Sequence, residues 1–327
     1  MAYYLGLDTS NYTTSAALYD TKSEDILQTK KLLPVKSGEK GLRQSDAVFH
    51  HTVQLPEILE QLDFSRIRLA GIGVSVRPRN TELSYMPCFL CGQTAARMIG
   101  HILEIPVYET SHQTGHILAA LYSAGVLAWK NHQFLAFHVS GGTTDCVLCT
   151  PDDAGQILQI KPVSSSLDLK AGQLIDRVGI MLGLHFPCGA ELEKLAMQSR
   201  KKFSYKPVIK GLNCCMSGLE NQCRKFYQEE HMPSCDVAMF CLTAIAEILK
   251  SMMDSAIRQE QTVRVLYAGG VMSDKYLQNQ LKNHSTNNLL FHSGIEIQTA
   301  FAEPAFSCDN AAGTAIYAAM HDSDFSD

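Results

Sequence analysis

Two histidines four residues apart, His112 and His116, are the clearest candidates for chemistry in this chain of 327 residues. Ser111 precedes them and can cap a helix, so both would lie on one face of its first two turns. Two such imidazoles can bind one metal ion, and imidazole suits Fe, Zn, Ni or Cu. A zinc peptidase of the HExxH type needs a glutamate after the first histidine, where this chain has Gln113. The alternative is that both are only polar residues near a helix start.

Two aspartates are further candidates. Asp309 lies where the last helix is expected to open, and an aspartate there is ordinarily a cap. It could equally be a carboxylate ligand that completes the two histidines. Asp176 is flanked by apolar residues, so it needs a partner: a nearby Lys or Arg, ribose hydroxyls or a metal.

Two Cys-x-x-Cys pairs, Cys88 with Cys91 and Cys146 with Cys149, have the spacing of zinc ligands. The second pair lies on an expected strand, where positions three apart point to opposite faces. The two pairs are also far apart in the sequence, unlike those of a compact zinc ribbon. Buried, reduced thiols are therefore the preferred interpretation.

Two glycine-bearing turns could hold a nucleotide. Ser140-Gly141-Gly142 and the two threonines that follow join two apolar runs, and the N–H groups of such a turn can bind phosphate, although two glycines often only make a hairpin. Gly269-Gly270 follows the expected buried strand 263–268 and precedes a helix expected from Ser273. That arrangement suits close passage of the backbone past a nucleoside.

The first turn has a counterpart near the N-terminus. Thr13-Thr14 and Thr143-Thr144 are 130 positions apart, and at that offset Ser10 matches Ser140 and Leu18 matches Leu148. An internal repeat of this kind predicts two similar lobes, each opening with a hairpin. Ligands favour clefts between domains, so we expect a nucleotide between the two turns.

Between these motifs, apolar runs alternate with helical patterns. This alternation predicts an α/β fold with mostly parallel sheets flanked by helices. In the first helix Pro56 should produce a kink or a break, and the buried stripe should be Val53, Leu55, Ile58 and Leu62. The other expected strands are 26–34, 67–75, 105–108 and 157–162, and the expected helices are 46–62, 87–103, 171–183 and 237–257.

Composition favours an ordered protein, with 46% hydrophobic and 19% charged residues. The net charge of −5 argues against a protein that coats nucleic acid, but not against a local basic patch. Arg200 to Lys206 is the most basic segment and could meet an acidic partner or be a solvated loop. No leader and no apolar run of membrane-spanning length is evident, so we expect a cytoplasmic protein without a membrane partner, whose eleven cysteines are reduced.

Together the motifs resemble one family. From about Tyr3 to Ala318 the chain is similar to the TsaD family, also called Gcp or glycoprotease, formerly O-sialoglycoprotein endopeptidase, and related to the Kae-type proteins. The order and spacing of the motifs are more specific than any one of them. The matching segments are Leu5-Gly-Leu-Asp-Thr-Ser10, His112-x-x-x-His116, Val139-Ser-Gly-Gly142, Ala171-Gly-x-x-x-Asp176, Leu182-Gly-Leu-x-x-Pro-x-Gly189, Met216-Ser-Gly-Leu219, Ala268-Gly-Gly-Val271 and Cys308-Asp-Asn-Ala311.

The resemblance implies an actin/Hsp70-like (ASKHA) fold of two duplicated lobes. We expect an N-terminal lobe of residues 1–130, a C-terminal lobe of 131–304, and a C-terminal helix at about 305–327 that packs back near the cleft. The implied activity is transfer of a threonylcarbamoyl group from threonylcarbamoyl-adenylate to N6 of adenosine 37 in tRNAs that read A-starting codons. The implied partners are tRNA and proteins similar to TsaB and TsaE, and a homodimer or heterodimer is compatible with this assignment.

Carried over position by position, the family's metal ligands are His112, His116 and Asp309. The metal would be a divalent ion, with Fe²⁺ favoured and Zn²⁺ as the alternative. ATP or the adenylate, with or without Mg²⁺, is the implied nucleotide, and no catalytic residue is implied beyond the metal site. The implied nucleotide contacts are His138, Val139, Ser140, Gly141, Gly142, Asp176, Gly189 and Asp274.

The chain also departs from the family pattern. The first motif usually continues Thr-Ser-Cys-Asp-Glu-Thr, whereas here Asn11, Tyr12 and Thr13 follow Ser10, so both acids are missing. The other departures are Arg77-Pro78-Arg79 for Gly-Pro-Gly, Thr114 for Glu, Thr143 for His and Asp274 for Asn. The sequence therefore indicates a divergent paralogue that is either a transferase or a nucleotide-binding regulatory or scaffold protein without turnover. A metalloendopeptidase, implied by the old family name, is the least supported alternative.

Overall fold

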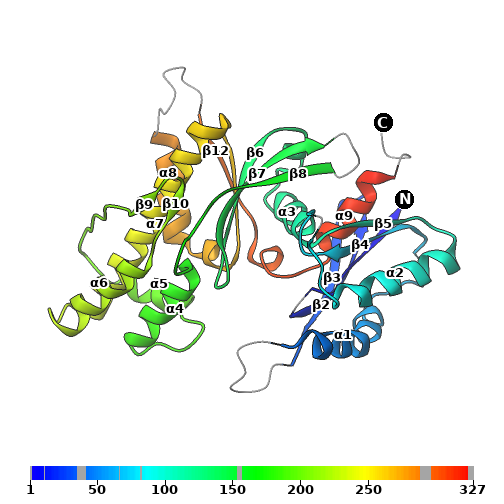
Figure 1. Ribbon diagram of the computed structural model, residues 1–327, viewed down its shortest axis with the longest axis horizontal. Coiled ribbons are helices and arrows are strands. Elements are labelled where there is room, and N and C mark those ends of the chain that lie inside the picture. Colours follow the sequence, from blue (N-terminus) through cyan, green and yellow to red (C-terminus); the bar gives the residue numbers. More distant parts are fainter. Residues whose placement is uncertain are drawn as a thin grey trace. The chain divides into compact units, whose positions relative to one another are not determined.

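The computed structural model describes residues 2–10, 12–34, 42–65, 67–81, 83–152, 157–287 and 296–322. Contacts divide the chain into two compact units (Figure 1). The first contains Met1–Lys130, Pro151–Gln159 and Ala305–Asp327, and the second contains Asn131–Thr150 and Ile160–Pro304. The first unit is thus assembled from both ends of the chain.

The first unit is built on a five-stranded sheet of order β3-β2-β1-β4-β5. β1 is antiparallel to β2 and parallel to β4, β2 is antiparallel to β3, and β4 is parallel to β5. The sheet is therefore mixed, and the prediction of a mostly parallel sheet was wrong for its hairpin half. The strands are β1 (Tyr3–Asp8), β2 (Thr13–Asp20), β3 (Ile26–Leu32), β4 (Leu69–Arg77) and β5 (Val107–Ser111).

Helices cover both faces of this sheet. α1 (Gln44–Leu59) and α2 (Phe89–Leu103) pack against the face that carries the large apolar residues of β1 and β4. α9 (Ala312–His321) packs against the opposite face, and α3 (His112–Ser123) packs against α9. Gly6 and Gly73 allow this approach, because a Cβ at either position would overlap the backbone of residues 311–315.

α1 differs from its prediction in two respects. It is one helix of 16 residues with Pro56 inside it, so the predicted break does not occur. Leu55 and Ile58 are buried as predicted, but Val53 is 48% exposed. The buried face instead includes His51 and Gln54, which hydrogen-bond to Thr14 Oγ1 at 2.8 and 2.9 Å and so tie α1 to β2.

The second unit repeats the plan of the first. Its sheet has the order β12-β11-β6-β7-β8, with β11 parallel to β12 and β6, and β6 antiparallel to β7. Leu5 pairs with Leu18 in the first hairpin and Leu135 pairs with Leu148 in the second, which is the offset of 130 seen in the sequence. The strands are β6 (Phe134–Val139), β7 (Thr144–Asp152), β8 (Ile157–Ser165), β11 (Arg264–Ala268) and β12 (Gln298–Phe301).

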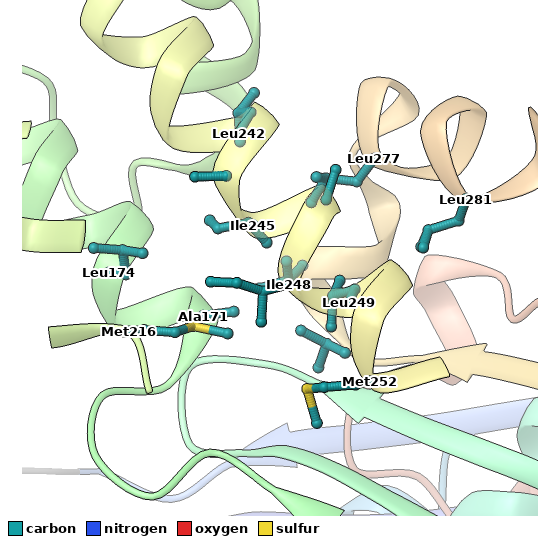
Figure 2. Packing of buried hydrophobic residues seen from close by; sticks show 14 of the residues in the cluster. Ala171, Leu174, Met216, Leu242, Ile245, Ile248, Leu249, Met252, Leu277 and Leu281 are labelled. Carbon is teal, nitrogen blue, oxygen red and sulfur yellow. The ribbon is translucent and has the colours of Figure 1, made fainter. Parts of the chain in front are cut away.

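The core of the second unit surrounds α7 (Ser234–Glu260), its longest described helix. Leu242, Ile245, Leu249 and Met252 of α7 are fully buried, and they lie among side chains from three neighbouring segments (Figure 2). Those segments include α4 (Ala171–Met181) and α8 (Lys275–Asn287). The remaining elements of this unit are α5 (Gly189–Ala196), α6 (Ser217–Gln228), β9 (Ile209–Lys210), β10 (Asn213–Cys214) and the 3-10 turn η2 (Gly270–Ser273). Two other 3-10 turns, η1 (Leu127–Asn131) and η3 (Pro304–Phe306), lie where the chain passes from one unit to the other.

The last helix is shorter than the expected span 305–327. α9 begins at Ala312 and ends at His321, while η3 occupies the start of the expected range and residues 323–327 lie outside those described. Across the described ranges, no helix combines the length and the apolar character that crossing a bilayer requires.

Candidate metal centre

The two histidines lie where the spacing predicts, at the start of α3. Ser111 is the N-cap, and its Oγ accepts a hydrogen bond from the Thr114 N–H at 3.2 Å. α3 therefore begins at His112, which places His116 one turn further along the same face. The two imidazole rings lie edge to face, with centroids 4.3 Å apart.

Asp309 reaches both histidines from the segment before α9. Its Oδ1 lies 3.1 Å from Nε2 of His116 and 3.5 Å from Nε2 of His112. The expectation that Asp309 lies at the opening of the last helix was wrong, since α9 begins at Ala312. Asn310 makes the local turn instead, because its Oδ1 accepts the Ala312 N–H at 3.0 Å. The Asp309 carboxylate therefore does not cap α9.

His112, His116 and Asp309 together form a cluster in which each residue offers one ligand atom, all within 4.8 Å of one another. The cluster lies wholly inside the first unit. Two imidazole nitrogens and one carboxylate oxygen suit iron or zinc and leave further coordination positions open. The donor set and its spacing thus fit a divalent transition metal.

A second carboxylate, which the sequence analysis did not single out, orients His112. Asp8, at the end of β1, is only 1% exposed, and its Oδ2 lies 2.8 Å from Nδ1 of His112. The same oxygen accepts the Ser75 hydroxyl at 2.6 Å, and Oδ1 accepts the Ser10 N–H at 2.9 Å. With Nδ1 as the donor to Asp8, Nε2 of His112 is left to face Asp309. The only sign of Asp8 in the sequence is that it is a lone carboxylate at the end of an apolar strand.

The two carboxylates make this centre strongly attractive to a cation. Burial alone would lower the pKa of His112, but Asp8 and Asp309 outweigh it and raise that pKa to about 10. Burial likewise works to raise the pKa of Asp309, yet the hydrogen bonds from His112 and His116 hold it well below its usual range. A metal ion at the centre would take the place of the proton on Nε2 of His112.

Thr13 occupies a position where the sequence analysis noted a missing acid. Its Oγ1 donates a hydrogen bond to Oδ2 of Asp309 at 3.4 Å. The first hairpin turn therefore contributes a neutral hydroxyl to the centre. Asn11 lies outside the described residues.

The predicted phosphate turn joins β6 to β7 in the second unit. Ser140 Oγ accepts the Gly142 and Thr143 N–H groups at 3.3 and 3.1 Å, which closes the turn. His138 and Val139 are the last residues of β6, directly before it. The N-terminus of α4 packs on the turn so closely that a Cβ at Gly172 would lie 2.6 Å from the Gly141 nitrogen.

The other predicted nucleotide contacts surround α5. Asp176 of α4 accepts the Cys188 N–H at 2.9 Å, directly before Gly189 opens α5. This backbone bond, rather than a Lys or Arg, is the partner found for Asp176. Asp274 caps α8 through the Leu277 N–H at 2.9 Å, and burial raises its pKa to about 6. The helix expected from Ser273 begins at Lys275, after η2.

The cysteines form no metal site in the part of the chain that the structure describes. All eleven are free, and among the described residues the only group of three side chains placed to hold a metal ion is His112, His116 and Asp309. Cys146 and Cys149 are both fully buried, and burial raises the pKa of each thiol. They pack as small apolar residues within β7.

The duplicated sheets define the fold class, which is that of the actin-like ASKHA proteins. A phosphate- and nucleotide-bound HypF superposes with a TM-score of 0.58 at 11% identity, over 97% of this chain and 45% of that one, so this chain spans less than half of HypF. A ROK family glucokinase from Streptomyces griseus, in complex with glucose and AMPPNP, gives 0.54 at 11% identity, over 98% and 100% of the two chains.

Sequence comparison gives the family. Residues 34–312 match the model of TsaD, tRNA N6-adenosine threonylcarbamoyltransferase, and this chain belongs to that family of transferases. A tRNA N6-adenosine threonylcarbamoyltransferase of Buchnera aphidicola subsp. Schizaphis graminum is 27% identical over 320 residues, which are 94% of this chain and 89% of the relative. The resemblance found in the motifs is thereby confirmed.

Proposed function

We propose that this protein transfers a threonylcarbamoyl group from threonylcarbamoyl-adenylate to N6 of adenosine 37 in tRNA, with a divalent metal held by His112, His116 and Asp309. One observation carries the proposal: in a chain of this family, potential ligand atoms of His112, His116 and Asp309, the last of which is 193 positions beyond His116, lie within 4.8 Å of one another. Two imidazoles and one carboxylate suit both Fe²⁺ and Zn²⁺. Fe²⁺ is the favoured metal and Zn²⁺ the alternative.

When bound, the metal supplies a Lewis acid that polarises a carbonyl or phosphoryl oxygen of the donor. The protein's own part is positional. Asp8 holds the His112 ring through Nδ1, and α3 fixes the two histidines on one face. Thr13 Oγ1 holds the second oxygen of Asp309, which keeps Oδ1 directed at both imidazoles.

The proposed step is a direct acyl transfer. The adenosine N6 attacks the carbamoyl carbon, a C–N bond forms, and the bond from that carbon to the phosphate oxygen of the adenylate breaks. AMP leaves, and N6 loses one proton. No protein nucleophile is required, and the described site supplies orientation and charge.

For the nucleotide, ATP or the adenylate with or without Mg²⁺, we propose the second unit. Ser140 Oγ accepts the Gly142 and Thr143 N–H groups, so the Gly141 N–H is the proposed phosphate donor of the turn, and His138, Val139 and Ser140 lead into it. Asp176, Gly189 and Asp274, which surround α5, are proposed for the nucleoside side.

The decisive experiment is reconstitution. The purified protein is incubated with tRNA, threonylcarbamoyl-adenylate and ferrous iron, alone and with TsaB-like and TsaE-like proteins, and the modified adenosine is quantified by mass spectrometry. We expect modification by the wild type and its loss in His116→Ala, together with loss of bound metal by elemental analysis. Modification that persists in a metal-free His116→Ala protein would contradict the proposed role of the metal. Size-exclusion chromatography of the same samples reports a homodimer or a heterodimer.

A nucleotide-binding regulatory or scaffold protein without turnover is the second candidate. The observation that favours it is the neutral first turn, where Tyr12 and Thr13 replace the usual acids and Thr13 contacts Asp309. Tight binding of ATP or the adenylate, with no modification of tRNA under any of the conditions above, would select it. An endopeptidase has no comparable support, because Gln113 follows His112.

A further inference from the structure

An extended segment of the second unit, residues 200–210, collects positive charge and is called the basic strap below. It follows α5 and ends with β9. From residue 202 to 210, exposed and partly buried side chains alternate, and Lys202, Lys206 and Lys210 are all exposed. Such a period of two is typical of an extended chain with one face on the protein and one in solvent.

The inward face fixes the basic strap to the core. Phe203 and Tyr205 both contact the ring of Phe240 on α7 edge to face, with centroids 5.9 and 6.1 Å apart. Lys201 Nζ lies 2.8 Å from Asp236, whose other oxygen accepts the Ser199 hydroxyl at 2.6 Å. The outward lysines are therefore displayed on an ordered backbone, which reduces the entropy cost of binding a partner.

The charge of this region is segregated from the rest of the chain. Residues 194–219 contain six lysines and arginines and no acidic residue, in a protein whose net charge is −5. Lys202, Lys206 and Lys210 form no ion pair with any carboxylate of the described residues, whereas Lys201 does. A basic stripe of this kind attracts a polyanion.

We propose that the basic strap binds the sugar–phosphate backbone of an RNA, and that this RNA is the tRNA substrate of the proposed function, on which the inference rests. Lys202, Lys206 and Lys210 are four residues apart, roughly 13 Å in an extended chain, so each can meet a separate phosphate. Phe203 and Tyr205 pack edge to face on Phe240, whereas four of the exposed side chains of the basic strap are lysines. Recognition is therefore by backbone charge and independent of base sequence.

The test is equilibrium binding of unmodified tRNA to the full chain, by fluorescence anisotropy over 0.05–0.4 M salt. Three phosphate contacts contribute about 2–3 to the slope of log affinity against log salt. Lys202→Ala/Lys206→Ala/Lys210→Ala should lose that much slope and bind about 100-fold more weakly at 0.1 M salt. The same three positions changed to Arg should retain both the slope and most of the affinity.

The matched control changes three other exposed lysines, Lys22, Lys161 and Lys282, to Ala, which alters net charge by the same amount. It should retain the wild-type slope. An equal loss of slope in both alanine variants would overturn the inference, because net charge alone would then explain the binding. Should the triple variant not fold, as judged by circular dichroism, the three single variants are measured, each with an expected loss of about 0.7–0.9 in slope.

Failure of this inference can be told apart from failure of the proposed function. If the wild type modifies tRNA and the triple alanine variant has the same salt slope and the same KM for tRNA, only the role of the basic strap is rejected. Wild type that neither binds nor modifies tRNA rejects the proposed function. Binding to vesicles of anionic lipid that depends on the three lysines, with tRNA binding that does not, would assign the surface to a membrane and overturn the RNA assignment.

Discussion

The hydrogen bond from His112 to Asp8 gives the sharpest test of the metal centre, through Asp8→Asn. The amide oxygen can still accept the Ser10 N–H in place of Oδ1. The amide NH₂ then replaces Oδ2, the oxygen that in the wild type accepts hydrogen bonds from Ser75 at 2.6 Å and His112 at 2.8 Å. Since NH₂ cannot accept a hydrogen bond, His112 loses the partner that keeps its proton on Nδ1.

The expected magnitude follows from this lost orientation. Removing a carboxylate that hydrogen-bonds a metal-binding histidine weakens metal affinity by about 10–100-fold, or about 1.4–2.7 kcal/mol. Folding should suffer as well, because a buried polar group left without a partner costs about 1–3 kcal/mol. The metal effect must therefore be measured on folded protein.

The assay is titration of the metal-free protein with Co²⁺ and Zn²⁺, following the Co²⁺ absorption bands and the heat of binding. Ser75→Ala is the control, since it removes one donor to Oδ2 but leaves His112 bound to Asp8. We expect weaker metal binding and altered Co²⁺ bands in Asp8→Asn only. A folded Asp8→Asn protein with metal affinity within twofold of wild type would refute the reasoning.

Three further outcomes are expected from urea unfolding. Burial raises the pKa of Asp274 to about 6, so its negative charge opposes folding at pH 7. Asp274→Asn should therefore be more stable than wild type at pH 7 by up to about 3 kcal/mol, and this gain should vanish near pH 4, where Asp274 of the folded wild type is protonated. A gain that does not vary with pH would contradict this. Gly172→Ala should cost about 1–3 kcal/mol, because its Cβ would press on the Gly141 nitrogen, and an unchanged midpoint would show that the turn yields freely. Leu249→Ala, in the core around α7, should cost about 2–5 kcal/mol, whereas Val53→Ala, at a position that is 48% exposed, should cost less than about 1 kcal/mol; similar losses at the two positions would be inconsistent with the packing described.

The sequence predicted those features that depend on local spacing. The offset of 130 predicted the duplication, and the structure pairs Leu5 with Leu18 and Leu135 with Leu148 in the same register. Ser111 as a cap was enough to place both histidines on one face of α3. In each case the deciding interaction lies within a few residues or repeats at a fixed interval, so the pattern alone is informative.

Features set by distant contacts were not predictable in the same way. Val53 fits an apolar stripe, yet the buried face of α1 is chosen by Thr14, which bonds to His51 and Gln54. The place of Asp8 at the end of an apolar strand did not reveal which residues it contacts, because its partners Ser75 and His112 are 67 and 104 positions away. The start of α9 was placed too early, since Asn310 rather than Asp309 makes the turn before it.

The split first unit has a consequence for how the protein is made. Gly6 and Gly73 lie against residues 311–315, and Asp309 comes from the same late segment. While the ribosome is still adding the second unit, the nascent first sheet lacks α9 over one face, and His112 and His116 lack their carboxylate. The three candidate ligand atoms therefore come together only once synthesis has passed Asp309.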